Sequence, residues 1–184
     1  MYNYGLIVGR FHTFTKGHEN LVNNALKVCK KVLIFVGSAQ EYGTSKNPLK
    51  VETRIKIIKA IYKNNPNVIV APLNDLTKER KDANNTRWGD YLLENARNIL
   101  GENPDCMILG LASDEVVRIN GWFDIDSIEN INFLLVPRST TSISGTEVRN
   151  FMINGNVSEW EKWTNKSIHY MYDEIREELL NVHN

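Results

Sequence analysis

Short apolar runs alternate with amphipathic segments along most of the chain. Residues 4–8 and 32–36 are continuous apolar runs, the pattern of a strand that is buried on both faces of a sheet. Between them, residues 19–29 carry apolar side chains at helical spacing. The alternation continues, so we expect further strands at 68–71, 107–109 and 133–136, and further helices at 51–62, 87–100, 144–153 and 167–182.

This order of elements predicts an α/β fold. Strands that alternate with helices of this length favour βαβ units and a parallel sheet. We predict a doubly wound parallel five-stranded sheet that binds ligands beyond the carboxyl ends of its strands. The 184 residues suffice for one such domain and are too few for two. We expect a single domain over residues 1–184, with a C-terminal helical extension from about residue 160.

Composition narrows the class of protein. Lysine plus arginine equals aspartate plus glutamate at 22 each, so the net charge is zero. Nucleic-acid binders usually carry a basic excess or a basic stripe, and we therefore expect no nucleic-acid partner. Cys29 and Cys106 lie far apart without metal-ligand spacing, which favours core positions and a cytoplasmic location. No apolar run approaches the roughly 18 residues of a membrane span, so we expect no membrane partner.

Three basic residues gather where the first helix begins: Arg10, Lys16 and His18. A helix N-terminus carries a partial positive charge, so added cations cost about 0.3–1 kcal/mol each unless an anion joins them. Free backbone N–H groups, the dipole and these cations together predict a polyphosphate site. A simpler reading makes Thr15 an N-cap and Gly17 a point of close approach, but capping does not explain three basic groups. The segment is not a P-loop.

A second helix start has a similar character. Ser144 followed by Glu147 forms a capping box. Gly145 and Thr146 offer N–H and hydroxyl donors, and Arg149 follows about one turn later. Both helix starts follow strands of the predicted sheet, so both can face one crevice and clamp a polyphosphate from two sides.

These two segments carry a resemblance to a known superfamily. Residues 9–18 resemble the first signature of nucleotidyltransferases with a His-x-Gly-His-type motif, here in the form Thr-Lys-Gly-His. Residues 143–149 are similar to their second signature, of the Ile-Ser-x-Thr-x-x-Arg type. Within that superfamily the chain looks most like the archaeal-type nicotinamide-mononucleotide adenylyltransferases. The further matching pieces are residues 37–40, 47–49, Arg54, Trp88 and 154–155.

The resemblance, which covers residues 4 to about 160, implies a Rossmann-like nucleotidyltransferase fold and transfer of an adenylyl group from ATP to nicotinamide mononucleotide. Two departures stand out. The family usually has histidine where Thr15 stands, and glutamine-proline where His12 and Thr13 stand. A threonine at the first position also occurs in phosphopantetheine adenylyltransferases. Loss of one imidazole should alter the contacts to the nucleotide phosphates, and His12 is a candidate substitute.

The resemblance also implies residue roles. His18 and Lys16 would hold the α and β phosphates, Arg149 with Thr146 the β and γ phosphates, and Arg10 phosphates of either substrate. Arg54 would add charge at the triphosphate end. The ATP-binding set is completed by Gly9, Phe11, Thr15, Gly17 and Ser144. Magnesium would be carried by the phosphates, with no dedicated protein carboxylates, since Mg²⁺ commonly keeps several waters.

The residues that would bind the acceptor nucleotide are less closely specified by the sequence. Trp88 either stacks on the nicotinamide ring or is a partly buried tryptophan at a helix start. Asn85 and Arg87 are weaker candidates, and Gly37 with Ser38 completes the predicted substrate-binding set. The polar loop 39–48 is either a lid that closes over substrates or a mobile surface loop.

Other functions fit the same motifs. The chain could transfer the adenylyl group to phosphopantetheine or another phosphorylated acceptor, or transfer a cytidylyl group from CTP. It could also be a nucleotide-binding module without turnover, although a sensor needs no clamp for a leaving group. The choice between nicotinamide and nicotinate mononucleotide stays open. The resemblance further implies a homo-oligomer.

Overall fold

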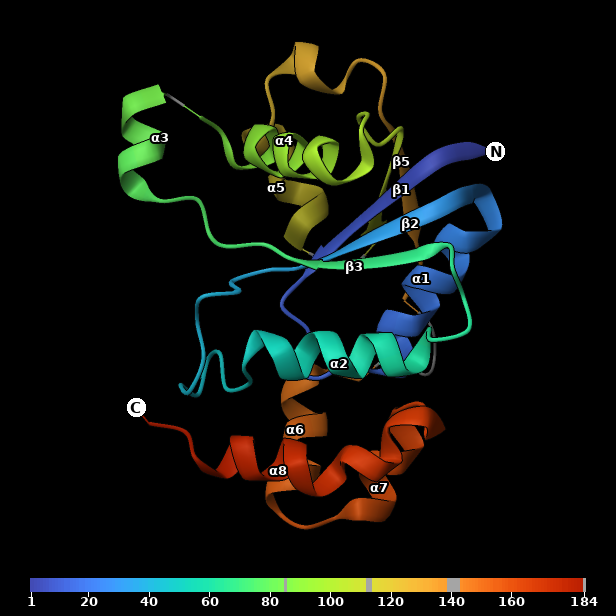
Figure 1. The fold of residues 1–184 in the computed structure, drawn as a ribbon, viewed down its shortest axis with the longest axis vertical. Coiled ribbons are helices and arrows are strands. Elements are labelled where there is room, and N and C mark those ends of the chain that lie inside the picture. The colour runs from blue at the N-terminus through green and yellow to red at the C-terminus, as the bar shows by residue number, and fades with distance from the viewer. Residues whose placement is uncertain (85, 112–113, 139–142, 184) are drawn as a thin grey trace.

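Five parallel strands form one sheet at the centre of the molecule (Figure 1). The computed structural model describes residues 1–84, 86–111, 114–138 and 143–183. Every strand pair is parallel, and the order β3-β2-β1-β4-β5 places β1 in the middle. The predicted doubly wound sheet is therefore confirmed. The strands span Tyr2–Gly9 (β1), Cys29–Val36 (β2), Val68–Pro72 (β3), Cys106–Gly110 (β4) and Asn132–Val136 (β5).

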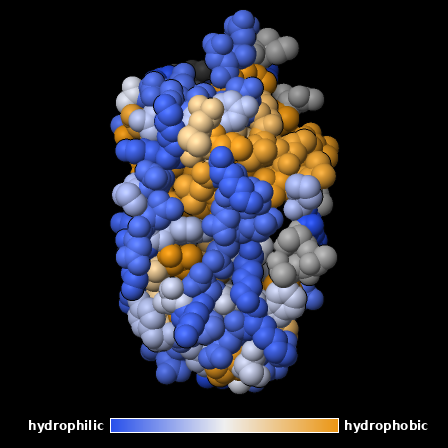
Figure 2. Space-filling view, turned by 90° about the vertical axis from the view of Figure 1, so that its right-hand side faces the viewer, coloured by the Kyte–Doolittle hydropathy of each residue, from blue (hydrophilic) through white to orange (hydrophobic). Residues whose placement is uncertain are grey.

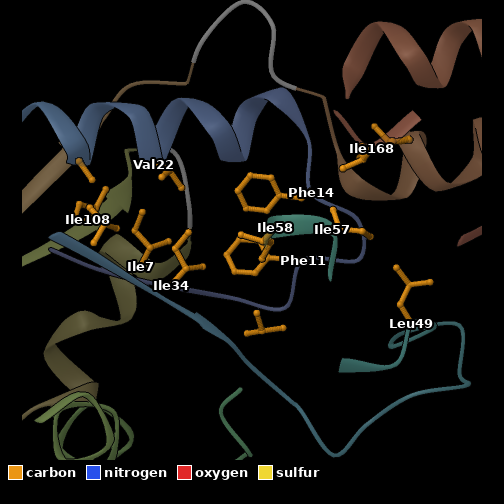
Figure 3. Close-up of a cluster of buried hydrophobic side chains, with 14 of the residues drawn as sticks. Ile7, Phe11, Phe14, Val22, Ile34, Leu49, Ile57, Ile58, Ile108 and Ile168 are labelled. Carbon is orange, nitrogen blue, oxygen red and sulfur yellow. The ribbon is translucent and has the colours of Figure 1, made fainter. Parts of the chain in front are cut away.

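Alternating side chains of each strand enter two separate apolar clusters. Ile7 and Ile34 pack on one face of the sheet, and their neighbours Leu6 and Leu33 pack on the other. The first face is covered by α1 (Lys16–Val28), α2 (Val51–Ile61) and α6 (Gly145–Ile153), and Figure 3 shows its cluster. The second face is covered by α4 (Trp88–Leu100) and α5 (Asp114–Trp122). Burial on both faces explains the continuous apolar runs in the sequence.

The C-terminal part packs onto the first of these faces. It comprises α7 (Val157–Trp163), a 3-10 helix η2 (Lys166–Met171) and α8 (Tyr172–Leu180). Trp160 and Ile168 are fully buried in the same cluster as the sheet side chains. The single helix predicted at 167–182 is wrong in detail, because its first part is η2. With three residues per turn, η2 brings Ile168 and Met171 to the same side.

Several helices were not predicted. The polar stretch 74–86 contains α3 (Lys78–Asn84), and α5, α7 and the 3-10 helix η1 (Ile125–Ile128) are likewise additional. Each is short, so none shows an apolar stripe over several turns. Helix α1 begins three residues before the predicted start at Glu19, directly after its N-cap Thr15.

The two cysteines and the surface can be compared with what the composition predicted. Cys29 and Cys106 are both buried and free, which confirms their predicted core positions. In the part of the chain that the structure describes, no helix is long and apolar enough to cross a membrane. Hydrophilic residues make up most of the lower half of the face in Figure 2, with small apolar patches among them, and the largest apolar surface lies in its upper half. Leu135, on the edge strand β5, is 42% exposed.

Candidate functional site

The loop between β1 and α1 is shaped by a tight aromatic packing. Phe11 has a φ of 56°, in the left-handed region, and its ring is buried against Phe14 and His18 at centroid distances of 5.3 and 5.1 Å. Figure 3 shows Phe11 and Phe14 within the apolar cluster beside α1. A Cβ on Gly9 would lie 2.7 Å from the Phe11 ring, so glycine is needed there. The packing turns the chain sharply at the carboxyl end of the central strand.

The start of α1 fixes the tautomer of His18. The backbone N–H of Thr15 donates to His18 Nδ1 at 3.0 Å. A ring nitrogen that accepts this bond carries no proton, so the neutral imidazole holds its proton on Nε2. Burial lowers the pKa of His18 to about 4. At neutral pH, His18 is therefore an uncharged N–H donor at a helix N-terminus.

The start of α6 brings an arginine to the same loop. Ser144 is the N-cap, and its hydroxyl accepts from the backbone N–H of Glu147 at 3.2 Å. Arg149 donates to the backbone carbonyl of His12 and to Thr146 Oγ1. Gly145 leaves room for this guanidinium, since a Cβ there would lie 3.3 Å from Arg149 Nη1. The first and second signatures are thus joined by a direct hydrogen bond.

A small pocket of about 220 Å³ lies where the two helix starts meet. Arg10, His18 and Arg149 converge there as the sequence predicted, with Phe11 and Gly145 beside them. None of the described residues that line the pocket is acidic. Guanidinium groups and N–H donors in a concave site bind anions, and bind phosphate oxygens particularly well. The remaining lining residues are His12, Thr13 and Lys46.

Lys46 and Thr13 were not among the predicted site residues, and His12 was named only as a substitute. Lys46 reaches the pocket from the loop 39–48. That loop is held in place by Asn47, which accepts from Arg10 Nη1 at 3.1 Å, and by Gly43, whose carbonyl accepts from the backbone N–H of His183. The prediction that this loop closes over substrates could have singled out its lysine. Its action as a lid stays a prediction.

The structure does not place Arg54 as predicted. Its side chain is fully buried and donates to the backbone carbonyls of Arg10, Gly37 and Ser38, at 3.0, 2.7 and 3.2 Å. These bonds use both terminal nitrogens of the guanidinium, and Arg54 does not line the small pocket, so its contact with the triphosphate stays a prediction. Arg54 instead ties the loop after β1 to the loop after β2. Gly37 and Ser38, predicted to bind substrate, here supply carbonyls to Arg54.

Lys16 also differs from its predicted place. It is exposed and does not line the pocket with His18. It lines a neighbouring polar groove of about 520 Å³ between α1 and the C-terminal helices, together with Glu19 and His169. The reason is helical geometry, since residues two positions apart point to opposite sides of a helix.

The predicted ATP-binding residues Thr15, Gly17, Ser144 and Thr146 lie at the two helix starts. Thr15 is buried, Gly17 is partly buried, and Ser144 and Thr146 are exposed. Thr15 and Ser144 occupy the N-cap positions of α1 and α6. The backbone N–H groups at the two starts can therefore face a ligand in the pocket.

The predicted acceptor residues lie around the start of α4. Trp88 is partly buried, and its ring packs against Tyr91 at 5.6 Å. Arg87 donates to the carbonyl of Phe123 and pairs with Asp124 at 3.2 Å. Asn85 lies outside the described residues. Neither Trp88 nor Arg87 lines the small pocket, so any role in acceptor binding concerns a separate part of the site.

Comparisons with known proteins give two kinds of adenylyltransferase. A phosphopantetheine adenylyltransferase from Polynucleobacter necessarius is 28% identical over 167 residues, which cover 87% of this chain and 91% of that protein. A nicotinamide-nucleotide adenylyltransferase from Archaeoglobus fulgidus is 25% identical over 175 residues, which cover 91% of this chain and 89% of that protein.

Solved structures agree on the fold. A bifunctional NMN adenylyltransferase/ADP ribose pyrophosphatase from Francisella tularensis superposes with a TM-score of 0.72 at 23% identity over 98% of this chain. The chain spans about half of that protein, 53% of its length. A second structure of it is complexed with AMP and a manganese ion. The Cytidylyltransferase-like family matches residues 6–151, and the chain belongs to that family.

Proposed function

We propose that this protein transfers the adenylyl group of ATP to nicotinamide mononucleotide, giving NAD and pyrophosphate. The observation that carries the proposal is the convergence of Arg10, His18 and Arg149 on one pocket between two helix N-termini. The relative from Archaeoglobus fulgidus, named for this activity and aligned over most of both chains, supports the choice of acceptor.

The reaction is a direct displacement at phosphorus. A phosphate oxygen of the mononucleotide attacks the α-phosphorus of ATP and forms the new P–O bond. The bond from that phosphorus to the oxygen bridging the α and β phosphates breaks, and pyrophosphate leaves with the electron pair. The second pKa of a phosphate monoester is about 6, so the nucleophile is already ionised at neutral pH. The reaction therefore needs no general base.

The residues of the pocket act by positioning and by stabilising charge. Negative charge grows on the departing pyrophosphate, and preorganised donors that meet it lower the barrier. His18 donates its Nε2–H to a phosphate oxygen, and Arg149 offers a guanidinium already held by His12 and Thr146. Arg10 can exchange its bond to Asn47 for a bond to phosphate. Lys46 adds a fourth cationic or N–H donor side chain from the loop 39–48.

Magnesium belongs to the proposal as a companion of ATP. The lining of the pocket offers cations and N–H donors, which bind phosphate oxygens and not a metal ion. Within residues 1–84, 86–111, 114–138 and 143–183, no three His, Cys, Asp or Glu side chains group in a way that could hold a metal. The donor set fits an ion that the phosphates carry, and such an ion would offset part of their charge.

Phosphopantetheine is the second candidate acceptor. Two observations favour it: Thr15 stands where adenylyltransferases for nicotinamide mononucleotide usually have histidine, and the relative from Polynucleobacter necessarius is named for that activity. Both acceptors are phosphate monoesters, so the chemistry at the α-phosphorus is the same. The acceptors differ in what must be recognised beyond the phosphate, which is a flat ring in one and a flexible chain in the other.

Pyrophosphate release from ATP and Mg²⁺ tests the function. The panel comprises nicotinamide mononucleotide, nicotinate mononucleotide, phosphopantetheine, and a reaction without acceptor. We expect release with a pyridine mononucleotide, and the two rates rank nicotinamide against nicotinate. Release only with phosphopantetheine would move the assignment to the second candidate. No release with any acceptor, while ATP still binds, would leave a nucleotide-binding module.

Trp88→Ala tests the predicted ring contact. Loss of a stacked aromatic face should raise the KM for nicotinamide mononucleotide and leave ATP binding nearly unchanged. The matched control is Tyr91→Phe, which keeps the ring against Trp88 and removes only the hydroxyl bond to the carbonyl of Asn74. A fall in ATP affinity in the alanine variant would contradict the assignment.

Three further expectations stay predictions. The chain is a homo-oligomer, it has no nucleic-acid partner, and it acts in the cytoplasm. The exposed Leu135 on the edge strand β5 offers a place for a subunit contact. Light scattering of the purified chain measures the first of these directly.

A further inference from the structure

His12 is a polar side chain buried at the phosphate pocket, with only 6% of its surface exposed. Its Nδ1 accepts a hydrogen bond from the backbone N–H of Leu49 at 3.2 Å. A ring nitrogen that accepts in this way carries no proton, so the neutral ring holds its proton on Nε2. The fold therefore fixes His12 as a donor through Nε2–H, and this atom is buried.

The surroundings of His12 keep its ring uncharged. Burial lowers the pKa of His12 to about 3, and the guanidinium groups of Arg54, Arg149 and Arg10 contribute in that order. The side chain of Asn47 acts in the opposite direction and is the smallest of these contributions to the pKa. His12 consequently stays neutral throughout the range in which nucleotide chemistry is run, and its Nε2–H persists as a hydrogen-bond donor.

That donor lacks a partner among the residues that the structure describes. The side-chain oxygen of the neighbouring Asn47 already accepts from Arg10 Nη1. A buried donor without a partner is destabilising, and such groups in native proteins usually await a water or a ligand. The arginines around His12 favour a negatively charged acceptor.

We propose that His12 donates its Nε2–H to a phosphate oxygen of the nucleotide held in this pocket, a role that rests on the proposed adenylyl transfer. The contact would supply, from a position three residues earlier, the imidazole donor that is absent at Thr15. A neutral donor adds a hydrogen bond without placing a further cation beside Arg10 and Arg149. His12 would thus be a catalytic residue, because it would touch a phosphate of the substrate.

Nuclear magnetic resonance of ¹⁵N-labelled histidine tests the contact without any need for turnover. The chain has four histidines, and single variants assign them. We expect the Nε2–H tautomer for His12 at neutral pH, and a shift of its Nε2 resonance when millimolar inorganic pyrophosphate is added. An Nδ1–H tautomer would overturn the proposal. So would an unchanged His12 signal while His18 responds, or no response of either histidine to pyrophosphate.

A pair of amide variants separates the role of the Nε2–H donor of His12 from that of the hydrogen bond between Leu49 and Nδ1. In His12→Asn the amide oxygen can take the place of Nδ1 and accept from Leu49, but the donor at Nε2 is lost. In His12→Gln an amide N–H can reach the position of Nε2. We expect kcat/KM to fall about tenfold in the asparagine variant, the effect of one net hydrogen bond, and much less in the glutamine variant.

The outcomes of this pair are decisive in both directions. Equal losses in the two variants, or no loss in either, would overturn the donor role, and melting temperatures show whether folding is the cause. His169→Gln is the matched control, since His169 lies on η2 outside the pocket and its replacement should leave turnover unchanged. Wild-type protein that shifts His12 with pyrophosphate but releases none from ATP would contradict the proposed function and keep the contact.

Discussion

The two helix starts at the pocket share a capping arrangement and use it differently. In α1 the third helical residue is His18, whose ring accepts from the backbone N–H of Thr15. In α6 the third helical residue is Glu147, whose carboxylate accepts from the backbone N–H and the hydroxyl of Ser144. In α1 the residue that completes the capping box, His18, itself lines the pocket. In α6 neither Ser144 nor Glu147 lines the pocket, and Arg149 does.

This difference separates two ways of building a phosphate site. In α1 one side chain both orders the helix start and presents a donor, so the bond to Thr15 selects the tautomer that can donate. In α6 the two tasks fall to Glu147 and Arg149. A substitution of His18 in α1 should therefore change both stability and turnover. In α6, a substitution of Glu147 should change mainly stability, and a substitution of Arg149 mainly turnover.

Replacing His18 should have the largest effect. In His18→Asn the amide oxygen can still accept from Thr15, whereas the donor at Nε2 is lost. We expect kcat to fall by about two orders of magnitude, the scale found when one charge-stabilising donor is removed. The measurement is pyrophosphate release at saturating ATP and acceptor, alongside the melting temperature.

His18→Gln is the companion variant, because its amide N–H can approach the position of Nε2. It should retain more turnover than the asparagine variant and lose more stability, since the bond to Thr15 is weakened. If the asparagine variant turns over at the wild-type rate, His18 serves only as a cap. In both helices the third residue would then only cap the helix start, and neither would act in turnover.

Arg149→Lys should cost about tenfold or more in kcat. A lysine cannot bond the His12 carbonyl and Thr146 together while it also presents a planar group to phosphate. Arg176→Lys is the matched control, because Arg176 also donates to two carbonyls, those of Met152 and Ile153, at the far end of α6. Similar losses of turnover in both variants would point to helix packing instead of phosphate binding.

The two helix starts should also differ in their response to acid. The folded pKa of His18 is about 4, below the ordinary value of 6.5, so between these values only the unfolded chain binds the proton. Stability from the neutral ring is complete above about pH 6.5 and falls by about 1.4 kcal/mol per pH unit as pH drops toward 4. His12 adds a similar loss that extends to about pH 3. Hydrogen bonds from Ser144 lower the pKa of Glu147, so α6 loses stability only at more acidic pH.

Urea unfolding at about pH 7, 6 and 5 measures this difference. The wild-type free energy of unfolding should decline toward pH 5. In His18→Gln the decline should be shallower, with a slope that corresponds to about one fewer proton taken up on unfolding. Glu147→Gln should leave the slope in this range unchanged. Identical slopes in wild type and His18→Gln would mean that the ring of His18 is not held neutral.

Local sequence signals predicted the helix starts and the sheet. The apolar runs at 32–36 and 107–109 are long enough to indicate buried strands, and they became β2 and β4. The caps and the basic residues of each signature lie within about ten residues of one another, so one strand-to-helix turn gathers them. His18 and Arg149 could be placed for this reason.

Contacts between segments that are distant in sequence explain why Arg54 and Lys46 were not placed correctly from the sequence. Arg54 is occupied by carbonyls of two loops that are 17 and 44 residues away in sequence, and no local pattern shows where those carbonyls point. Lys46 enters the pocket through the conformation of a loop without regular structure. The position of Lys16 was predictable in principle, since helical spacing sets it opposite to His18.

Glu147→Ala should have the smallest effect on turnover, and it tests most directly whether capping and binding are separate in α6. Loss of the carboxylate leaves the backbone N–H and hydroxyl of Ser144 to water and should lower the melting temperature by about 2 °C. Turnover should stay within about twofold of wild type, because a cap outside the pocket contributes only local order. A large loss of turnover with a small loss of stability would show that Glu147 orients Arg149, which lies two residues further along α6. The cap and the binding group would then be coupled in α6 as they are in α1, through two side chains in place of one.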